Sequence, residues 1–595
     1  MDCGVIGNCK SAALIDGRGT VVWCCLPDFD SASVFASLLD EEKGGAFGIE
    51  VDATYAITQA YVPNTNVLRT VYESAEGGFE LYDLMPRHRS EGVYYAPPEL
   101  LRYLRRTHGA PVLKVYYRPK LGYARYETQS VSHPEYIKST VQDGVYESLY
   151  LYTSLAHEDV LEGRPVKLAG DAFLLLSYHQ KVRPVTLERM VLEVERTKVY
   201  WMDWVARTTE FTAWNGFIRR SALVLKLLSY QESGAILAAL TTSLPEALGE
   251  GRNWDYRFCW IRDATMTLNV LTRLGHLNVA RNFFNYVLRV VPYKDDEIQV
   301  MYGIRGNKKL EEQTLDWLAG YKGSRPVRVG NAAHSQRQHD IYGVLLNAVL
   351  TYMEVFRSDE ATVERLWTIT RSLVRIVMRT WRQPDVSIWE YRANPAHFTF
   401  SKVLCWVALD RAARIAGLLG QDRLAEPWVA EREIIRADIF ANGWSEQAGA
   451  FTQRYGSETL DASMLLLASY GFVEQSDPRF VATVRKVWQE LCRDGLMFRY
   501  KDDDDFGTPT SSFTICSFWM VKALWQIGEQ DEAERMFNKL LGYANPLGLL
   551  SEDLDFKTKE QLGNFPQGYS HLALIDCAIL LGGVRPAASP VLARL

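Results

Sequence analysis

The sequence predicts two parts, an antiparallel β-sandwich followed by a helical domain. Up to about residue 185, short runs of alternating apolar and polar residues are separated by Gly, Pro, Asn and Asp, which is typical of antiparallel strands. Beyond about residue 230, apolar residues recur at helical spacing almost to the C-terminus. With 595 residues, of which 47% are hydrophobic, the chain is long enough for more than one buried core.

Residues 1–185 are expected to form the β-sandwich, from about ten to twelve strands. The clearest element is a hairpin over residues 13–23, ALIDGRGTVVW. It turns at Asp16 to Gly19, because Asp and Gly tolerate the backbone conformations of tight turns. From Thr186 the apolar period becomes helical, so residues 186–230 are expected to form a helical linker.

Residues 231–595 are expected to form the helical domain. About twelve apolar stripes, joined alternately by short turns and long loops, indicate about six helical hairpins. Such hairpins either close into a ring, an (α/α)6 barrel, or form an open helical array with the same local pattern. We expect the (α/α)6 barrel, with its long loops at one end. The stripes are 234–245, 263–275, 277–291, 340–356, 360–382, 399–418, 422–440, 459–470, 478–494, 512–528, 530–542 and 569–582.

Composition disfavours several classes of function. A formal net charge of −6 disfavours nucleic acid as the main partner. The nine cysteines form no CxxC motif, so we expect reduced thiols, no metal site and no cofactor. No run of about 20 apolar residues predicts a membrane span, and the N-terminus lacks the pattern of a secretory signal. We therefore expect a soluble cytoplasmic protein.

Two long loops carry a Glu beside apolar residues. Glu390 follows Ile388 and Trp389, and Glu552 precedes Asp553. Each Glu alone is most often a solvated or ion-paired carboxylate, but two of them at one end of an aromatic-lined ring indicate the two-carboxylate chemistry of glycoside hydrolysis. Packing against Trp389 is expected to favour the uncharged form of Glu390, as a general acid requires. Glu552, in a more polar loop, is expected to remain ionised and activate water.

The segment Trp260-Ile261-Arg262-Asp263 stands at a predicted helix start. Arg262 offers a rigid donor fork, Asp263 offers two acceptors, and Trp260 offers a stacking face, a set that suits a terminal hexose. The alternative is a structural ion pair between Arg262 and Asp263, with Asp263 as the N-cap.

Other loop residues have two interpretations each. Gln338, Asp340 and Gln567 are candidate sugar contacts, or helix caps and loop braces, and Trp389 is a further candidate for substrate binding. The acidic run Asp502–Asp505 either binds a hard cation or is simply solvated.

Several segments together resemble a known family. They are IGNCKSAALID, WCCLPDFDSASVFA, NWDYRFCWIRDA, GSRPVRVGNAAHSQRQHDIYG, SIWEYRANPAHFTFSKVLCWVALDRA and LGNFPQGYSHLAL. Over essentially its whole length the chain resembles the bacterial and archaeal branch of glycoside hydrolase family 15. That family includes glucoamylases, glucodextranases, isomaltose-type glucohydrolases and some trehalases.

The resemblance implies a β-sandwich joined by helices to an (α/α)6 catalytic barrel. It implies that Glu390 is the general acid and Glu552 the general base. Glu390 is followed by Tyr391 where fungal glucoamylases carry a second Glu, so the linkage preference is not predicted. The resemblance further implies contacts with the terminal glucose or the hydrolytic water by Tyr256, Trp260, Arg262 and Asp263.

The leading hypothesis is an exo-acting, inverting α-glucoside hydrolase of the glucoamylase or α-glucosidase type, which releases β-glucose from the non-reducing end of short α-glucosides. The close alternative is a trehalase that uses the same site. A disaccharide phosphorylase and a non-catalytic glucoamylase-like module are further alternatives, which the pair Glu390 and Glu552 disfavours. The expected partner is a small oligosaccharide or disaccharide. The sequence predicts no oligomeric state.

Overall fold

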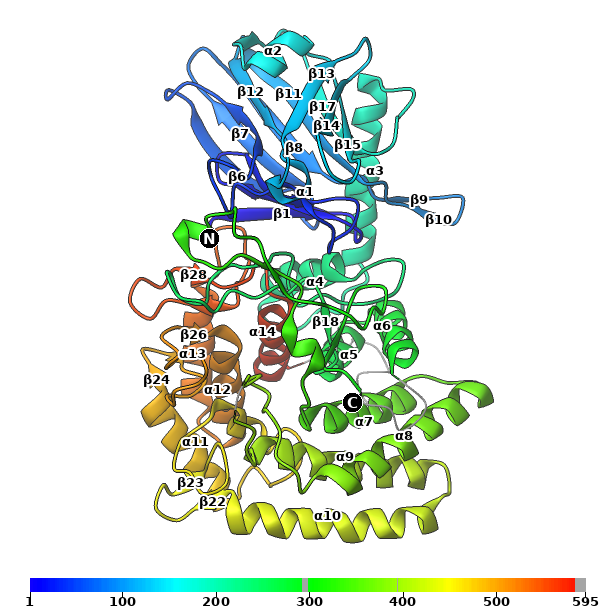
Figure 1. Ribbon diagram of the computed structural model, residues 1–595, viewed down its shortest axis with the longest axis vertical. Coiled ribbons are helices and arrows are strands. Elements are labelled where there is room, and N and C mark those ends of the chain that lie inside the picture. Colours follow the sequence, from blue (N-terminus) through cyan, green and yellow to red (C-terminus); the bar gives the residue numbers. More distant parts are fainter. Residues whose placement is uncertain (292–297, 393, 584–595) are drawn as a thin grey trace.

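The protein consists of a β domain and a helical domain, stacked along the long axis of the molecule (Figure 1). The structure is a computed structural model that describes residues 1–291, 298–392 and 394–583. Helix α3 (Leu187–Val205) runs beside the β domain toward the helical domain. The side chain of Thr186 caps α3 by accepting a hydrogen bond from the Arg189 backbone N–H. The change of period predicted at Thr186 is confirmed.

Two antiparallel sheets enclose the core of the β domain. A 7-stranded sheet has the order β1-β2-β3-β5-β12-β16, with β4 paired to β3, and an 8-stranded sheet has the order β13-β14-β15-β17-β11-β8-β7-β6. The first consists of β1 (Cys3–Gly7), β2 (Ala12–Asp16), β3 (Val21–Cys25), β4 (Ser33–Phe35), β5 (Ala46–Glu50), β12 (Val112–Arg118) and β16 (Val166–Lys167). The second consists of β6 (Ala56–Tyr61), β7 (Leu68–Glu73), β8 (Gly77–Leu84), β11 (Glu99–Gly109), β13 (Thr128–Ser132), β14 (Ile137–Val141), β15 (Ser148–Thr153) and β17 (Ala172–Tyr178).

The predicted hairpin is confirmed as β2 and β3. The Gly19 N–H donates to the Asp16 carbonyl at 2.9 Å, and the Asp16 carboxylate accepts from the Thr20 N–H at 2.8 Å. The domain has more strands than the expected ten to twelve, because short strands such as β4, with 3 residues, and β16, with 2, extend the sheets. An additional hairpin, β9 (His88–Ser90) and β10 (Val93–Tyr95), projects beside α3 (Figure 1).

The helices of the second domain close into a ring, so the predicted (α/α)6 barrel is confirmed and the open array is not. Around the inside, α5 contacts α7, α7 contacts α9, η3 contacts α12, α12 contacts α14, and α14 contacts α5. Phe400 of α9 meets Tyr470, after η3, at 6.1 Å between ring centroids. The inner elements are α5 (Ala264–Arg273), α7 (Asp340–Val355), α9 (Thr399–Leu418), η3 (Ala462–Leu466), α12 (Thr514–Gln526) and α14 (Gly568–Gly582). The outer elements are α4 (Asn215–Leu228), α6 (Leu277–Val290), α8 (Glu360–Thr380), α10 (Asp422–Asn442), α11 (Pro478–Leu491) and α13 (Gln530–Leu541).

Burial distinguishes the two layers. Inner helices such as α12 and α14 are buried on nearly all sides, and their sequences are apolar all round. Outer helices such as α11 and α13 bury a single stripe and expose a polar face. A helix that has neighbours on every side needs no polar face.

Two of the predicted helices are wrong. Residues 234–245 are extended, with the Ala238 N–H donating to the Phe258 carbonyl and the Ala239 N–H to the Tyr256 carbonyl, each at 3.0 Å. A fully buried extended run is as apolar as a buried helix, which explains the error. Helix α4 lies within the predicted linker. It occupies the outer position of the ring that residues 234–245 were expected to fill, and it packs against α14. Residues 459–470 contain only the short 3-10 turn η3.

The long loops gather at one end of the ring, because each of them leads into the N-terminus of an inner element. This end faces the β domain. The Trp23 indole donates to the Leu240 carbonyl at 2.9 Å, and the Trp317 indole donates to the Tyr123 carbonyl at 2.8 Å. The first residues of the predicted loop 292–339, up to 297, lie outside the described part of the chain.

Within the described residues, no helix is both long enough and apolar enough to span a bilayer, and the cytoplasmic location stays a prediction. All nine cysteines are free thiols.

Candidate active site

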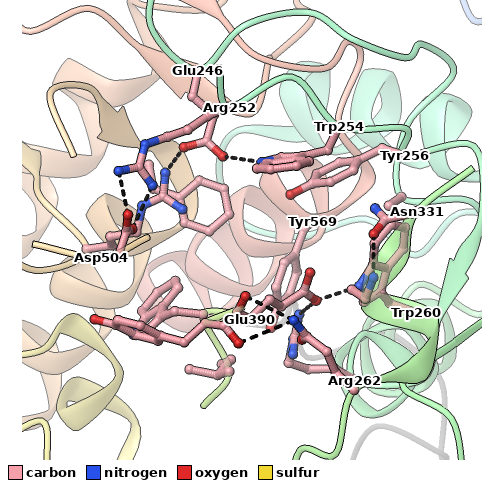
Figure 2. Close-up of a pocket in the computed structure, with 18 of the residues that line it drawn as sticks. Glu246, Arg252, Trp254, Tyr256, Trp260, Arg262, Asn331, Glu390, Asp504 and Tyr569 are labelled. Atoms are coloured by element: carbon pink, nitrogen blue, oxygen red, sulfur yellow. Dashed lines mark hydrogen bonds and ion pairs between the residues drawn. The ribbon is translucent and has the colours of Figure 1, made fainter. Parts of the chain in front are cut away.

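A cavity opens at the loop end of the ring. Every long loop that leads into α5, α7, α9, α12 or α14 contributes residues to it. In Figure 2, Glu390 and Arg262 lie at the bottom of the view, and Trp254 and Tyr256 lie at the top. The polar and aromatic lining residues include Arg252, Trp254, Tyr256, Trp260, Arg262, Asp263, Asn331, Gln336, Trp389, Glu390, Arg392, Arg499, Asp504, Phe506, Phe513, Trp519, Gln567 and Tyr569.

Glu390 presents its carboxylate to two donors. Its Oε1 accepts from the Trp260 indole Nε1 at 2.8 Å and from Arg262 Nη2 at 3.0 Å. The backbone of Glu390 has φ 62°, a left-handed conformation that costs a residue other than glycine about 1–3 kcal/mol and is frequent at functional sites. The side chain is 22% exposed, so a ligand can reach it.

Glu390 was expected to pack against apolar residues, but its carboxylate contacts hydrogen-bond donors instead. Trp389 turns away, donating from its indole to Asp461 at 2.8 Å and packing near Phe513 and Trp519. Adjacent residues in such a turn point in different directions, so the sequence neighbour of Glu390 is not its spatial neighbour.

Glu552 is buried next to a small sheet, so the more polar setting expected for it, which would have kept it ionised, is not found. The sheet consists of β26 (Ser512–Phe513), β27 (Asp553–Leu554) and β28 (Gln561–Leu562). Glu552 Oε2 accepts from the Asn564 backbone N–H at 2.9 Å. Gly563 has φ +69°, and a Cβ there would lie 2.7 Å from the same oxygen, so this position requires glycine. Burial raises the pKa of Glu552, and hydrogen bonds from Asn564 and Tyr256 oppose that rise.

Tyr256 connects the two glutamates. Its hydroxyl is on the Glu552 side, and its ring packs against Trp260, which is bonded to Glu390, with 5.0 Å between ring centroids. Burial is the main cause that raises the pKa of the Tyr256 hydroxyl well above its usual range, and the negative charges of Glu552 and Glu390 raise it further. The hydroxyl therefore stays protonated and can act only as a neutral donor or acceptor.

Arg262 is aimed into the cavity by residues behind it. Its Nη1 donates to Gln338 Oε1 at 2.7 Å and lies 3.7 Å from Asp340 Oδ2. Neither Gln338 nor Asp340 is among the residues that line the cavity. Both lie behind Arg262 and fix its direction, and Gln336 reaches the cavity in their place.

Asp263 lines the cavity beside Arg262. It stands at the N-cap of α5, but its side chain makes no capping hydrogen bond, and the ion pairs of Arg262 in the described structure are to Asp340 and Glu390. Burial raises the pKa of Asp263 to about 7, which the charge of Arg262 opposes and that of Glu390 supports. The structural alternative for these two residues is therefore not found.

The acidic run is occupied by protein partners. Asp504 accepts from Arg252 at 2.6 and 2.8 Å and from the Tyr500 hydroxyl at 2.6 Å. Asp502 pairs with Arg454 at 2.7 Å. Within the described chain, no three His, Cys, Asp or Glu side chains gather in a group suited to a metal ion.

Sequence reasoning placed Tyr256, Trp260, Arg262, Asp263, Trp389, Glu390 and Gln567, all of which line the cavity. It missed several residues at the cavity mouth. Trp254 had a usable signal, since it lies two positions before Tyr256 on the same face of an extended strand. Arg252, Arg392 and Phe506 had none, because their partners come from remote loops. Glu552 does not line the cavity itself, but it interacts with Tyr256, which does.

Most glycoside hydrolases use two carboxylates that flank the scissile bond, and in the inverting enzymes one is the proton donor and the other a base on the opposite side of the sugar. The cavity has aromatic sides and contains Glu390 in its lining, with Glu552 behind Tyr256, and this fold and site are typical of the glycoside hydrolase class. Residues 214–579 match the family described as "Glycosyl hydrolases family 15", and residues 2–138 match "Trehalase-like, N-terminal". The chain is a member of glycoside hydrolase family 15, as its motifs predict, and is an α-glucoside hydrolase.

Individual relatives cover almost the whole chain. A protein named trehalase from Mycolicibacterium smegmatis is 38% identical over 614 residues, which cover 97% of this chain and 90% of the relative. A trehalase from Thermoplasma acidophilum is 34% identical over 95% of this chain and 97% of its own length. A bacterial glucoamylase solved in complex with acarbose shares the fold, with a TM-score of 0.70 at 13% identity, over 97% of this chain and 93% of that one.

Proposed function

We propose that this enzyme is a trehalase, which hydrolyses α,α-trehalose to two glucose molecules. The observation that carries the proposal is that trehalases are similar to this chain along nearly its entire length, including both domains, at 38%, 37% and 34% identity. The comparisons thus favour the alternative over the leading glucoamylase-type hypothesis.

The cavity mouth supports a substrate of two sugar rings. We define the outer loop as residues 500–507. The buried pair of Asp504 with Arg252 holds this loop over the cavity, and the Phe506 ring packs against Trp254 at 5.1 Å. Arg392, which lines the cavity too, lies over Trp254 at 4.3 Å. Trehalose joins both anomeric carbons and carries no further chain, so an enclosed outer subsite suits it.

The proposed reaction is a single displacement with inversion. Glu552 takes a proton from a water molecule, which attacks the anomeric carbon. Glu390 gives its proton to the glycosidic oxygen, and the bond between that oxygen and the anomeric carbon breaks. The products are one β-glucose, from the attacked ring, and one α-glucose, from the leaving ring. Arg262 and Asp263 orient the attacked ring, and Tyr256 orients the water.

The test is glucose release from trehalose, maltose, isomaltose and soluble starch, each with and without inorganic phosphate. We expect trehalose to be the best substrate, with no phosphate requirement, and ¹H NMR to detect β- and α-glucose in equal initial amounts. Release only from maltose or isomaltose would restore the glucoamylase-type hypothesis. Dependence on phosphate would indicate a phosphorylase, and no release at all would indicate a non-catalytic module.

A further inference from the structure

The strand that carries Tyr256 has two faces with different surroundings. Trp254 and Tyr256 line the cavity, whereas Asp255 and Arg257 are buried on the opposite side, at 0% and 1% exposure. The segment is extended, since the Ser243 N–H donates to the Trp254 carbonyl at 2.9 Å and Thr242 bridges to Asp255. Alternate side chains of an extended segment point to opposite faces. Each residue that contacts the cavity is therefore flanked by residues that do not.

Arg257 extends away from the cavity into the β domain. Its Nη1 donates to the Ser31 carbonyl at 2.9 Å and to the Cys25 sulfur at 3.6 Å. Its guanidinium also lies 5.7 Å from the centroid of the Tyr123 ring and 6.0 Å from that of Trp23. All four partners belong to the β domain, so the catalytic strand is anchored in the other domain by this side chain.

Asp255 completes the anchor on the side of the helical domain. Its two carboxylate oxygens accept from Arg257 Nε at 2.9 Å and Nη2 at 2.7 Å. Oδ2 also accepts from the Gly330 N–H at 3.1 Å, and the Asp255 carbonyl accepts from Asn331 Nδ2 at 3.2 Å. Asn331 lines the cavity. One buried ion pair thus joins the β domain, the strand of Tyr256 and the loop that leads into α7.

Tyr256 lies in the sequence between the two members of this ion pair, Asp255 and Arg257. A buried, fully hydrogen-bonded ion pair permits little displacement, since loss of one contact leaves a charge without compensation. Tyr256 in turn faces Glu552. A displacement of about 1 Å at a reacting group is enough to reduce a rate by about a hundredfold.

We propose that Arg257 is a positioning residue, through which the β domain fixes Tyr256 and the water that Glu552 activates. The β domain then contributes to catalysis without contacting the sugar. The inference rests on the roles given above to Tyr256 and Glu552, but not on the choice of trehalose as substrate.

The test compares Arg257→Met with a matched control, Arg220→Met, on whichever substrate the wild-type enzyme hydrolyses best. Arg220 is another arginine of the helical domain that reaches the β domain, donating to the Thr65 carbonyl at 3.0 Å and lying over Tyr61 at 4.0 Å. It does not line the cavity. We expect Arg257→Met to lower kcat about 10- to 100-fold with KM within about twofold. For Arg220→Met we expect a lower Tm and unchanged kcat and KM.

The pH profile is a second readout that loss of stability alone does not change. Tyr256 donates to Glu552 and lowers its pKa, so displacing Tyr256 raises that pKa. The acidic limb of kcat/KM, which reports the base in the free enzyme, is therefore expected to move to higher pH in Arg257→Met and to stay in place in Arg220→Met.

Arg257→Lys keeps the charge and some of the contacts, so we expect it to recover part of kcat. If Arg257→Met does not fold, Arg257→Lys decides, with a lower kcat at unchanged KM supporting the proposal. A folded Arg257 variant with wild-type kcat and pH profile, or with the same changes as Arg220→Met, overturns it. Failure of the wild type to hydrolyse any α-glucoside would contradict the proposed function instead.

Discussion

The Trp260 indole donates a hydrogen bond of 2.8 Å to Glu390 Oε1, although the two residues are 130 positions apart. This contact joins the loop before α5 to the loop before α9. It continues through the ring of Tyr256 to Glu552, so one line of contacts runs from the proposed acid to the proposed base.

Replacing Trp260 by Phe removes the indole donor and keeps an aromatic ring against Tyr256. In the proposed mechanism Glu390 becomes negatively charged as it gives up its proton, and a hydrogen bond to a charged group contributes about 1.5–3 kcal/mol. We therefore expect kcat/KM for trehalose to fall at least about tenfold, with little change in Tm. Trp317→Phe is the control, since it removes an indole donor to the Tyr123 carbonyl, away from the cavity. Equal activity of the two variants would show that the Trp260 contact is not used in catalysis.

The roles of the two glutamates separate with the leaving group. Glu390→Gln is expected to abolish hydrolysis of trehalose and to retain much of the activity on α-glucosyl fluoride, because fluoride leaves with little proton assistance. Glu552→Gln is expected to lose both activities, since both substrates need activated water. The reverse pattern would exchange the two roles. An inverting pair also predicts carboxyl groups about 6.5–9.5 Å apart in a crystal structure.

Arg392→Ala tests the enclosed outer subsite. Arg392 lies over Trp254 and pairs with Glu312 at 2.8 Å, so its removal opens the cavity mouth. We expect KM for trehalose to rise about tenfold, and the kcat/KM of maltotriose relative to trehalose to rise as well. Arg454→Ala is the control, because Arg454 pairs with Asp502 of the same acidic run and does not line the cavity. An unchanged preference in Arg392→Ala would show that chain length is limited elsewhere.

His276 links stability to pH. It stacks on Trp204 at 3.7 Å between ring centroids, and burial lowers its pKa to about 3. Because the usual value in an unfolded chain is about 6.5, the unfolded state binds one more proton below that pH, and stability falls as the pH falls. The loss from pH 7 to pH 5 is about 2 kcal/mol. We expect His276→Gln to show a smaller decrease in Tm over this interval than the wild type.

Much of the fold was predictable, because each layer has its own pattern. The alternation of apolar and polar residues predicted the β domain, and the apolar stripes at helical spacing predicted the helical domain. The error at 234–245 has a physical cause, since a segment buried on all sides has no polar face to reveal its period. Helix α4 was assigned to the linker because amphipathicity does not show which neighbour covers the apolar face. The contact of α14 with α5 closes the ring, and no local pattern contains that contact.

The site was predictable where it lies within one motif, and less so where remote loops meet. Tyr256, Trp260, Arg262 and Asp263 share a single segment with a visible pattern. The pairing of Arg252 with Asp504 joins residues 252 positions apart, so the acidic run looked like a solvated loop or a cation site. Trp389 was expected to pack on Glu390, whereas the backbone turn sends the two side chains in different directions.

The two glutamates are held in place by different kinds of structure. Glu552 adjoins a small sheet and fits against a glycine that admits no side chain, whereas Glu390 sits in a turn that is held by contacts from other loops. If the proposed roles hold, we expect the surroundings of the base, Glu552, to tolerate fewer substitutions than those of the acid, Glu390. Directed evolution toward new leaving groups is best aimed at residues 385–392 and the outer loop, with 552–564 left as they are.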